Sequence, residues 1–222
     1  MQKFTLLHDG SVQGWHATYL AFHVAAQLGA SLQALLIDSN DDEESLEQRA
    51  IHIKTGARAA GVTLETRFLT DFSVTALKEN ISAIDGLFIP QRIIPDGESA
   101  TRLLEALPYP LWIALKEPEI REMAVLVNDP INDEKLIAYT KVLAHRFQQS
   151  LKVFIQRNEN RPTPTSETST LTWVSLPTFS LDDINSALTH LNAGLLFISA
   201  SNTAMTGRLP CNFVIYPETP DA

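Results

Sequence analysis

The chain has 222 residues, 45% of them hydrophobic and 19% charged, which is enough material for one large globular domain or two small ones. The formal net charge of −9 argues against a nucleic-acid-binding surface, because contacts with phosphates need clustered Lys and Arg. The single cysteine, Cys211, excludes an internal disulfide framework and a cysteine-based zinc cluster. No apolar stretch approaches the length of a membrane span, and the first residues lack a signal-peptide pattern. We therefore expect a cytoplasmic protein without nucleic-acid or membrane partners.

Hydrophobic patterning in the first 118 residues alternates between short buried strands and amphipathic helices. The turn residues Asp9-Gly10-Ser11 end the first strand, and Gly29 stands where a helix C-cap glycine belongs. Acidic residues 41–44 are interpreted as a helix start, because negative charge there complements the helix dipole. The expected strands are 4–8, 32–37, 62–69, 86–89 and 111–115, and the expected helices are 14–28, about 41–60, 71–81 and 99–107.

The same alternation begins again near residue 119. Strands are expected at 123–127, 151–155, 171–176, 194–198 and 213–216, and helices at 133–149 and 180–191. Residues 157–170, rich in Pro, Ser and Thr, stand where the first half has a whole helix. They are expected to form an exposed, poorly anchored loop.

Two pairs of segments have similar sequences. Residues 85–89 (DGLFI) correspond to 193–198 (AGLLFI), and residues 107–113 (LPYPLWI) correspond to 209–215 (LPCNFVI). Two diverged copies of one unit are the simplest explanation. Alternating strands and helices imply right-handed crossovers and a parallel sheet covered on both faces. We therefore predict an α/β fold with domains 1–118 and 119–222, each a doubly wound five-stranded sheet. The second domain should be the smaller, with its second and fourth helices absent or vestigial.

The order and spacing of these segments resemble the universal stress protein family. The resemblance rests on a strand ending in Asp9-Gly10-Ser11, a helix ending in Leu28-Gly29-Ala30, a strand from Leu32, and a helix running into Pro108-Tyr109-Pro110 before the last strand. It covers the whole chain as a tandem pair and is clearer in the first half. It implies two flavodoxin-like units related by a pseudo-twofold axis and paired through their last strands, 111–115 and 213–216.

Nucleotide-binding members of that family carry Gly-x2-Gly-x9-Gly-Ser/Thr after the fourth strand, where glycines let backbone N–H groups approach phosphate. Here Pro90 and Ile93 take the first two glycine positions, and the spacer has shrunk to residues 94–96. Gly97 remains, but Glu98 replaces the Ser/Thr, and together with Asp96 it adds negative charge. In the second half the corresponding loop, 199–204, reads SASNTA. Both phosphate cradles are therefore predicted to be defective.

The candidate ligand site lies at the carboxyl edge of the predicted first sheet, the usual place for ligands in open α/β folds. The resemblance implies that Asp9 contacts a ribose or an adenine, whereas its local sequence equally suits a turn or helix-cap aspartate. Asp129 is interpreted as its counterpart in the second half. Arg92 could meet an anionic ligand, although a solvated loop arginine is the simpler interpretation. The candidate ligand-binding residues are Asp9, Gly10, Ser11, Ile37, Arg92 and Gly97.

No catalytic constellation is recognisable. Ser11 lacks a nucleophile elbow and a His/Asp partner, and His8, His16 and His23 are not spaced to ligate one metal ion. Cys211 is interpreted as a structural thiol. We therefore expect a non-enzymatic stress-response or regulatory module with no metal and no cofactor, apart from weak adenine-nucleotide binding, that acts through self-association or protein partners. Two alternatives remain open: AMP or ATP binding by the first half alone, and a regulatory domain related to transporter-associated stress-protein domains.

Overall fold

The computed structural model describes residues 2–38, 45–81, 83–156 and 171–217, and its strands fall in two sets of five. The first set is β1 (Lys3–His8), β2 (Ser31–Ile37), β3 (Thr63–Leu69), β4 (Gly86–Pro90) and β5 (Leu111–Ala114). The second set is β6 (Met123–Val127), β7 (Leu151–Gln156), β8 (Leu171–Leu176), β9 (Leu195–Ser199) and β10 (Asn212–Tyr216). All ten strands expected from the sequence are present, and their ends differ from expectation by at most one residue.

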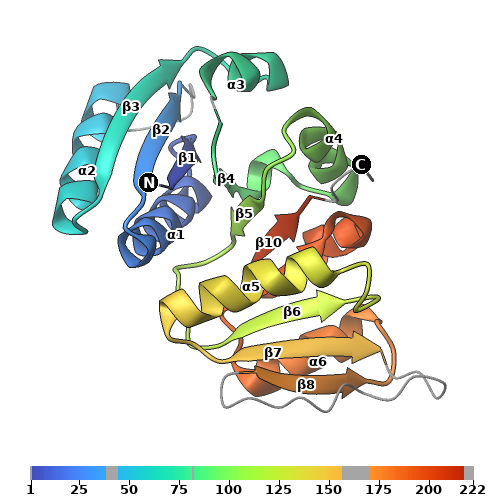
Figure 1. Ribbon diagram of the computed structural model, residues 1–222. Coiled ribbons are helices and arrows are strands. Elements are labelled where there is room, and N and C mark those ends of the chain that lie inside the picture. Colours follow the sequence, from blue (N-terminus) through green and yellow to red (C-terminus); the bar gives the residue numbers. More distant parts are fainter. Residues whose placement is uncertain (1, 39–44, 82, 157–170, 218–222) are drawn as a thin grey trace.

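The two sets join into one continuous sheet with the order β3-β2-β1-β4-β5-β10-β9-β6-β7-β8 (Figure 1). Every pairing within a set is parallel. The junction is antiparallel, with Phe213 opposite Ile113, Val214 opposite Trp112 and Ile215 opposite Leu111. Both sets therefore have the same internal order and run in opposite directions, as a twofold relation requires. The expected meeting of the two last strands at the centre is confirmed.

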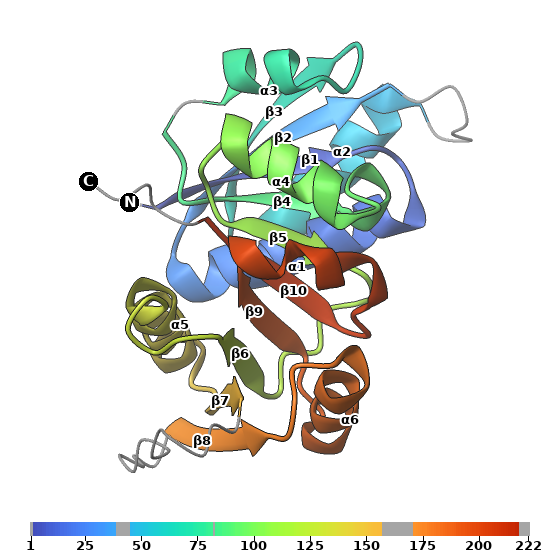
Figure 2. The ribbon, with the colours of Figure 1, turned by 90° about the vertical axis from the view of Figure 1, so that its right-hand side faces the viewer.

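Helices cover both faces of the sheet. They are α1 (Val12–Leu28), α2 (Leu46–Ala59), α3 (Val74–Asn80), α4 (Gly97–Ala106), α5 (Glu134–Phe147) and α6 (Leu181–Leu191), with 3-10 helices η1 (Gln91–Ile93) and η2 (Ala200–Arg208). The buried residues of α1, α2 and α5 form one core cluster with one face of the sheet, and those of α4 and α6 belong to the cluster on the other face. Figure 2 shows α5 and α6 on opposite sides of the second set of strands.

Local sequence signals explain the helix ends. Ser11 caps α1 by accepting a hydrogen bond from the Gly14 N–H, and Gly29 ends it with a φ of 62°. Ser45 and Gln48 form a capping box at the start of α2. The first turn of α2 therefore follows the acidic segment 41–44, which itself lies outside the described residues. The predicted loop 157–170 also lies outside them.

The second half differs from the first at the place of its fourth helix. The counterpart of α4 is η2, a 3-10 helix that packs directly against α4. Gly97 allows this approach, because a Cβ atom at that position would lie 2.5 Å from the carbonyl oxygen of Thr203. The hydroxyls of Thr101 and Thr203 lie 3.1 Å apart across the same contact. The prediction that this helix is absent or vestigial is wrong: nine residues form it, against ten in α4, and they are wound as a 3-10 helix instead of an α-helix. The domain division at residue 118 stays a prediction, since one sheet runs through both halves.

Within the described segments, no helix combines the length and the apolar character that crossing a bilayer would require.

Trp112 lies at the centre of the sheet and is completely buried. Its ring packs against Phe4 and Phe88 of the first half and against Phe197 of β9 in the second half, with centroid distances of 6.3, 5.2 and 5.9 Å. Aromatic pairs in this range add to the stabilisation from burial. Trp112 therefore contacts the hydrophobic cores of both halves.

We predict that Trp112→Ala lowers the free energy of unfolding by about 3–5 kcal/mol, because it leaves a cavity between the aromatic side chains of the two halves. Chemical denaturation followed by circular dichroism measures this change. Phe68→Ala is the matched control: Phe68 on the edge strand β3 is 55% exposed, and its loss should cost much less. Equal effects of the two substitutions would contradict the central role of Trp112.

Candidate functional site

Asp9 follows β1 directly, at the carboxyl edge of the first half, and its side chain is only 3% exposed. Its Oδ1 accepts hydrogen bonds from the backbone N–H and the hydroxyl of Ser11, at 3.1 and 2.6 Å. Gly10 turns the chain between them with a φ of 79°. Gly14 leaves room for the carboxylate, because a Cβ there would lie 2.5 Å from Oδ1. Asp9 is thus held against the first turn of α1 as a turn aspartate, because the cap of the helix is Ser11.

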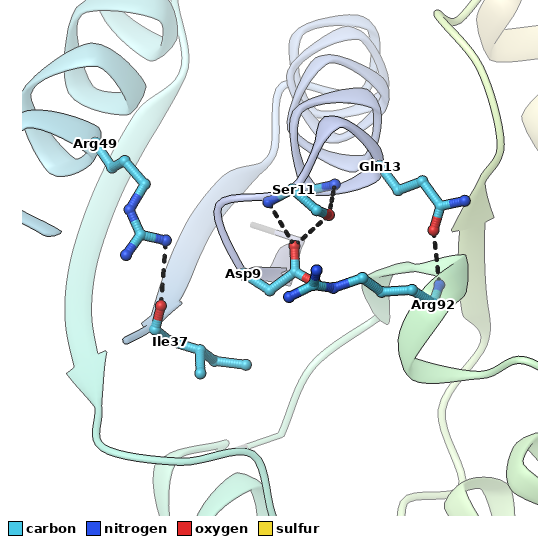
Figure 3. A network of polar contacts seen from close by, with 7 residues as sticks. Asp9, Ser11, Gln13, Ile37, Arg49 and Arg92 are labelled. Atoms are coloured by element: carbon cyan, nitrogen blue, oxygen red, sulfur yellow. Dashed lines mark hydrogen bonds and ion pairs between the residues drawn. The ribbon is translucent and has the colours of Figure 1, made fainter. Parts of the chain in front are cut away.

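Arg92 brings the loop after β4 to the same carboxylate. Its Nε donates to Oδ2 of Asp9 and forms an ion pair with it, as Figure 3 shows. The backbone N–H of Arg92 also donates to Oε1 of Gln13, at 2.8 Å. The 3-10 turn η1, which the sequence did not reveal, directs Arg92 towards α1. The ends of β1 and β4, adjacent in the sheet, are therefore linked by a half-exposed cation and a buried anion.

Ile37 ends β2, on the other side of β1, and its carbonyl oxygen accepts a hydrogen bond from Arg49 at 3.2 Å (Figure 3). Arg49 comes from α2 and is 1% exposed. The backbone carbonyl of Ile37, one of the candidate ligand-binding residues, therefore already has a protein donor. Sequence analysis missed Arg49 because nothing in the pattern of α2 distinguishes a buried arginine from a solvated one.

The start of α4 does not resemble an open phosphate cradle. The carboxylate of Asp96 caps the helix and accepts a hydrogen bond from the Ser99 N–H at 2.8 Å. The hydrogen bonds from Ser99 lower the pKa of Asp96, so this group is ionised at neutral pH. Gly97 faces Thr203 of η2 rather than standing beside Asp9 and Arg92. An anion approaching this helix end would therefore meet a fixed negative charge.

The second half places a neutral pair where the first half has an ion pair. In the parallel pairings, Phe4 lies opposite Gly86 and Met123 lies opposite Leu195. The repeat of residues 85–89 in 193–198 aligns Gly86 with Leu195, and counting along both strands from these partners places Asn128 at the position of Asp9 and Ser201 at that of Arg92. Asn128 Nδ2 donates to the hydroxyl of Ser201 at 3.2 Å. By this register Asp129, interpreted as the counterpart of Asp9, stands one residue later, but it reproduces the turn contact of Asp9, since its Oδ1 accepts from the N–H of Ile131, two residues along the chain, at 3.0 Å.

A polar hollow of about 660 Å³ opens beside this second pair. The carboxylate of Asp133, near the start of α5, accepts from the backbone N–H groups of Asn128 and Asp129, at 2.7 and 3.2 Å. The hydroxyls of Ser199 and Ser201 lie 2.7 Å apart. Three acidic side chains line the hollow, Asp129, Asp133 and Glu134, and Lys135 is the basic one among its described lining residues.

The histidines and the cysteine considered above as reactive or metal-binding residues pack against other parts of the protein. His8 lies 3.0 Å from the Thr18 hydroxyl and edge-on to Trp15, and His16 contacts the carbonyl of Leu115. Burial lowers the pKa of His23, which packs on Phe147. Burial raises the pKa of the Cys211 thiol to about 12, so the reactive thiolate is scarce at neutral pH. The described part of the chain holds no group of three side chains suited to a metal ion.

Comparisons with known proteins identify similar folds. No family model and no curated protein matches the chain. Solved structures match it over nearly its whole length. A universal stress protein from Archaeoglobus fulgidus DSM 4304 superposes with a TM-score of 0.66 at 11% sequence identity, covering 99% of this chain and 97% of that chain. A functionally unknown protein from Pseudomonas aeruginosa PAO1 gives a TM-score of 0.68 at 12% identity, covering 98% and 93%.

Both matches extend across the central junction, so they concern the pair of units and not one unit alone. The strand order, the antiparallel junction and these superpositions lead to one conclusion. This chain has the fold of a tandem universal stress protein.

Proposed function

We propose that this chain is a non-catalytic regulatory module of the universal-stress-protein type, in which contacts within the first half replace a bound nucleotide. The observation that supports the proposal is the ion pair between Asp9 and Arg92 across the ends of β1 and β4. In an open α/β sheet this edge is where a ligand would lie. A cation supplied by the protein itself neutralises the buried carboxylate, so a ligand has to displace an existing interaction before it binds.

Electrostatics support the same conclusion for the phosphates. Asp96 and Glu98 place two carboxylates at the start of α4, and the chain as a whole has a net charge of −9. Pro90 offers no N–H donor to a phosphate, and Ile93 adds a β-branched side chain. Protein contacts are therefore the proposed mode of action, with the two units held in a fixed arrangement by the β5–β10 junction.

We predict that ATP with Mg²⁺ binds no more tightly than a dissociation constant of about 100 μM. Isothermal titration calorimetry on the intact chain measures this directly, and native mass spectrometry of the freshly purified protein checks for a retained nucleotide. AMP is titrated in parallel, because a first half that kept only an adenosine site would bind AMP at least as well as ATP. Micromolar ATP binding, or a nucleotide retained at near-full occupancy, would overturn the proposal.

A second prediction concerns the ion pair itself. Arg92→Gln should lower the free energy of unfolding by about 1–3 kcal/mol at neutral pH, because it leaves the carboxylate of Asp9 buried without its cation. The matched control is Arg67→Gln. Arg67 is 47% exposed, close to the 48% of Arg92, but its partner Glu65 is 54% exposed whereas Asp9 is 3% exposed.

The control should change stability by less than about 0.5 kcal/mol, as is usual for a surface pair. Thermal and urea denaturation of both variants give the comparison. If Arg92→Gln is as mild as the control, the contact with Asp9 does not hold the site closed.

A further inference from the structure

A groove of about 680 Å³ lies on the α1/α5 face of the sheet, away from the carboxylate of Asp9. The carboxyl end of α1 contributes Leu28 and Gly29, α5 contributes its exposed side, and Tyr216 closes the groove at the end of β10. A volume of this size is within the range of small-molecule sites. The candidate residues of the first half play no part in it.

The floor of the groove is apolar and aromatic. The rings of Tyr139 and Tyr216 lie 5.0 Å apart, and Leu143 is buried beneath them. Val142 also lines the groove from α5 and is 61% exposed. An apolar stripe left open to solvent in this way offers surface that a ligand could bury.

The charge of the groove differs from that of the protein. Among the described residues that line it, both charged side chains, Lys135 and Arg146, are basic, although the chain carries a net charge of −9. Lys135, Tyr139, Val142 and Arg146 recur at the spacing of one helix face, so the two cations stand at opposite ends of the apolar stripe. They are separated along the helix axis by about 16 Å. Arg146 forms no ion pair with any described residue.

We propose that this groove binds a free amphipathic anion, a carboxylate with a linear aliphatic chain, with its head on Arg146 and its chain along Val142 and Tyr139 towards Tyr216. Guanidinium and carboxylate form the strongest paired hydrogen bonds available to such a ligand. The aliphatic chain of the ligand covers the apolar stripe of α5, so the methylene groups of the ligand and the side chains of the stripe are both removed from water. The groove is a hollow between α1 and α5, and a hollow can hold a single aliphatic chain. A membrane surface would instead be contacted by side chains that project from the protein.

The test titrates the intact protein with sodium decanoate, below the concentration at which it forms micelles, by isothermal titration calorimetry. Binding should have a dissociation constant of about 100 μM or tighter. Octanoate should bind about tenfold more weakly, as expected from the loss of two buried methylenes. Decanol, which lacks the charge, should also bind about tenfold more weakly.

Two variants locate the site. Arg146→Gln should weaken decanoate binding about tenfold and leave decanol binding unchanged. Lys141→Gln is the control, since Lys141 is exposed on the same helix but does not line the groove. It should change the affinity by less than about twofold, the effect of long-range charge alone. Ala138→Trp, at an exposed lining position, should abolish binding while the circular dichroism spectrum stays native.

Three results would overturn the proposal. The first is no binding of decanoate to the wild-type protein, and the second is equal effects of Arg146→Gln and Lys141→Gln. The third is binding to vesicles of phosphatidylglycerol without binding to decanoate, which would make the face a membrane contact. Each result also leaves the proposal about the Asp9–Arg92 site standing, because that site shares no residue with the groove.

Discussion

The antiparallel pairing of β5 with β10 is the constraint on which the rest of this structure depends. Each half is a parallel sheet that would otherwise expose β5 or β10 as an unpaired central edge, with backbone N–H and C=O groups open to other chains. Pairing the two edges satisfies these groups inside one polypeptide and produces a ten-stranded sheet. Trp112 then packs with Phe88 on its own side and Phe197 on the other, so the two cores are continuous.

The junction reverses the direction of the strands. The carboxyl ends of the strands in the first half and in the second half therefore lie at opposite ends of the sheet, measured along the strands. The two potential ligand sites are therefore separate and have been free to diverge. One carries a buried carboxylate with an arginine, and the other a neutral pair of asparagine and serine beside an acidic hollow. The fold joins two units whose surfaces at these edges differ.

The packing of α4 on η2 depends on a glycine at the start of α4. In a phosphate loop a glycine lets a ligand approach the backbone. Here Gly97 lets the carbonyl of Thr203 approach it, so contact between the two halves occupies the space that a side chain would need. At Ile37, too, a protein group lies on the backbone, because its carbonyl oxygen accepts a hydrogen bond from Arg49.

Much of the fold could be predicted from sequence because its signals are local. Apolar runs of β-branched and aromatic residues place the strands, serines and glycines place the helix ends, and the internal repeat predicts both the two-unit arrangement and the central strands. The turn at Asp9-Gly10-Ser11 belongs to this class, since its hydrogen bonds join residues two or three positions apart.

The site depended on tertiary structure because its decisive contacts join residues far apart in the chain. Asp9 and Arg92 are brought together by the adjacency of β1 and β4, and no local pattern distinguishes that arginine from a solvated one. The register that pairs Asn128 with Ser201 depends on strand alignment, where a shift of one residue changes every partner. The groove along α5 exists only because α1 and β10 lie beside it. Sequence by itself determined which elements form and in what order, since these follow from short-range periodicity and turn chemistry. Only the packed structure decided which charges meet, because ion pairs and cavities depend on distances between elements that sequence spacing does not encode.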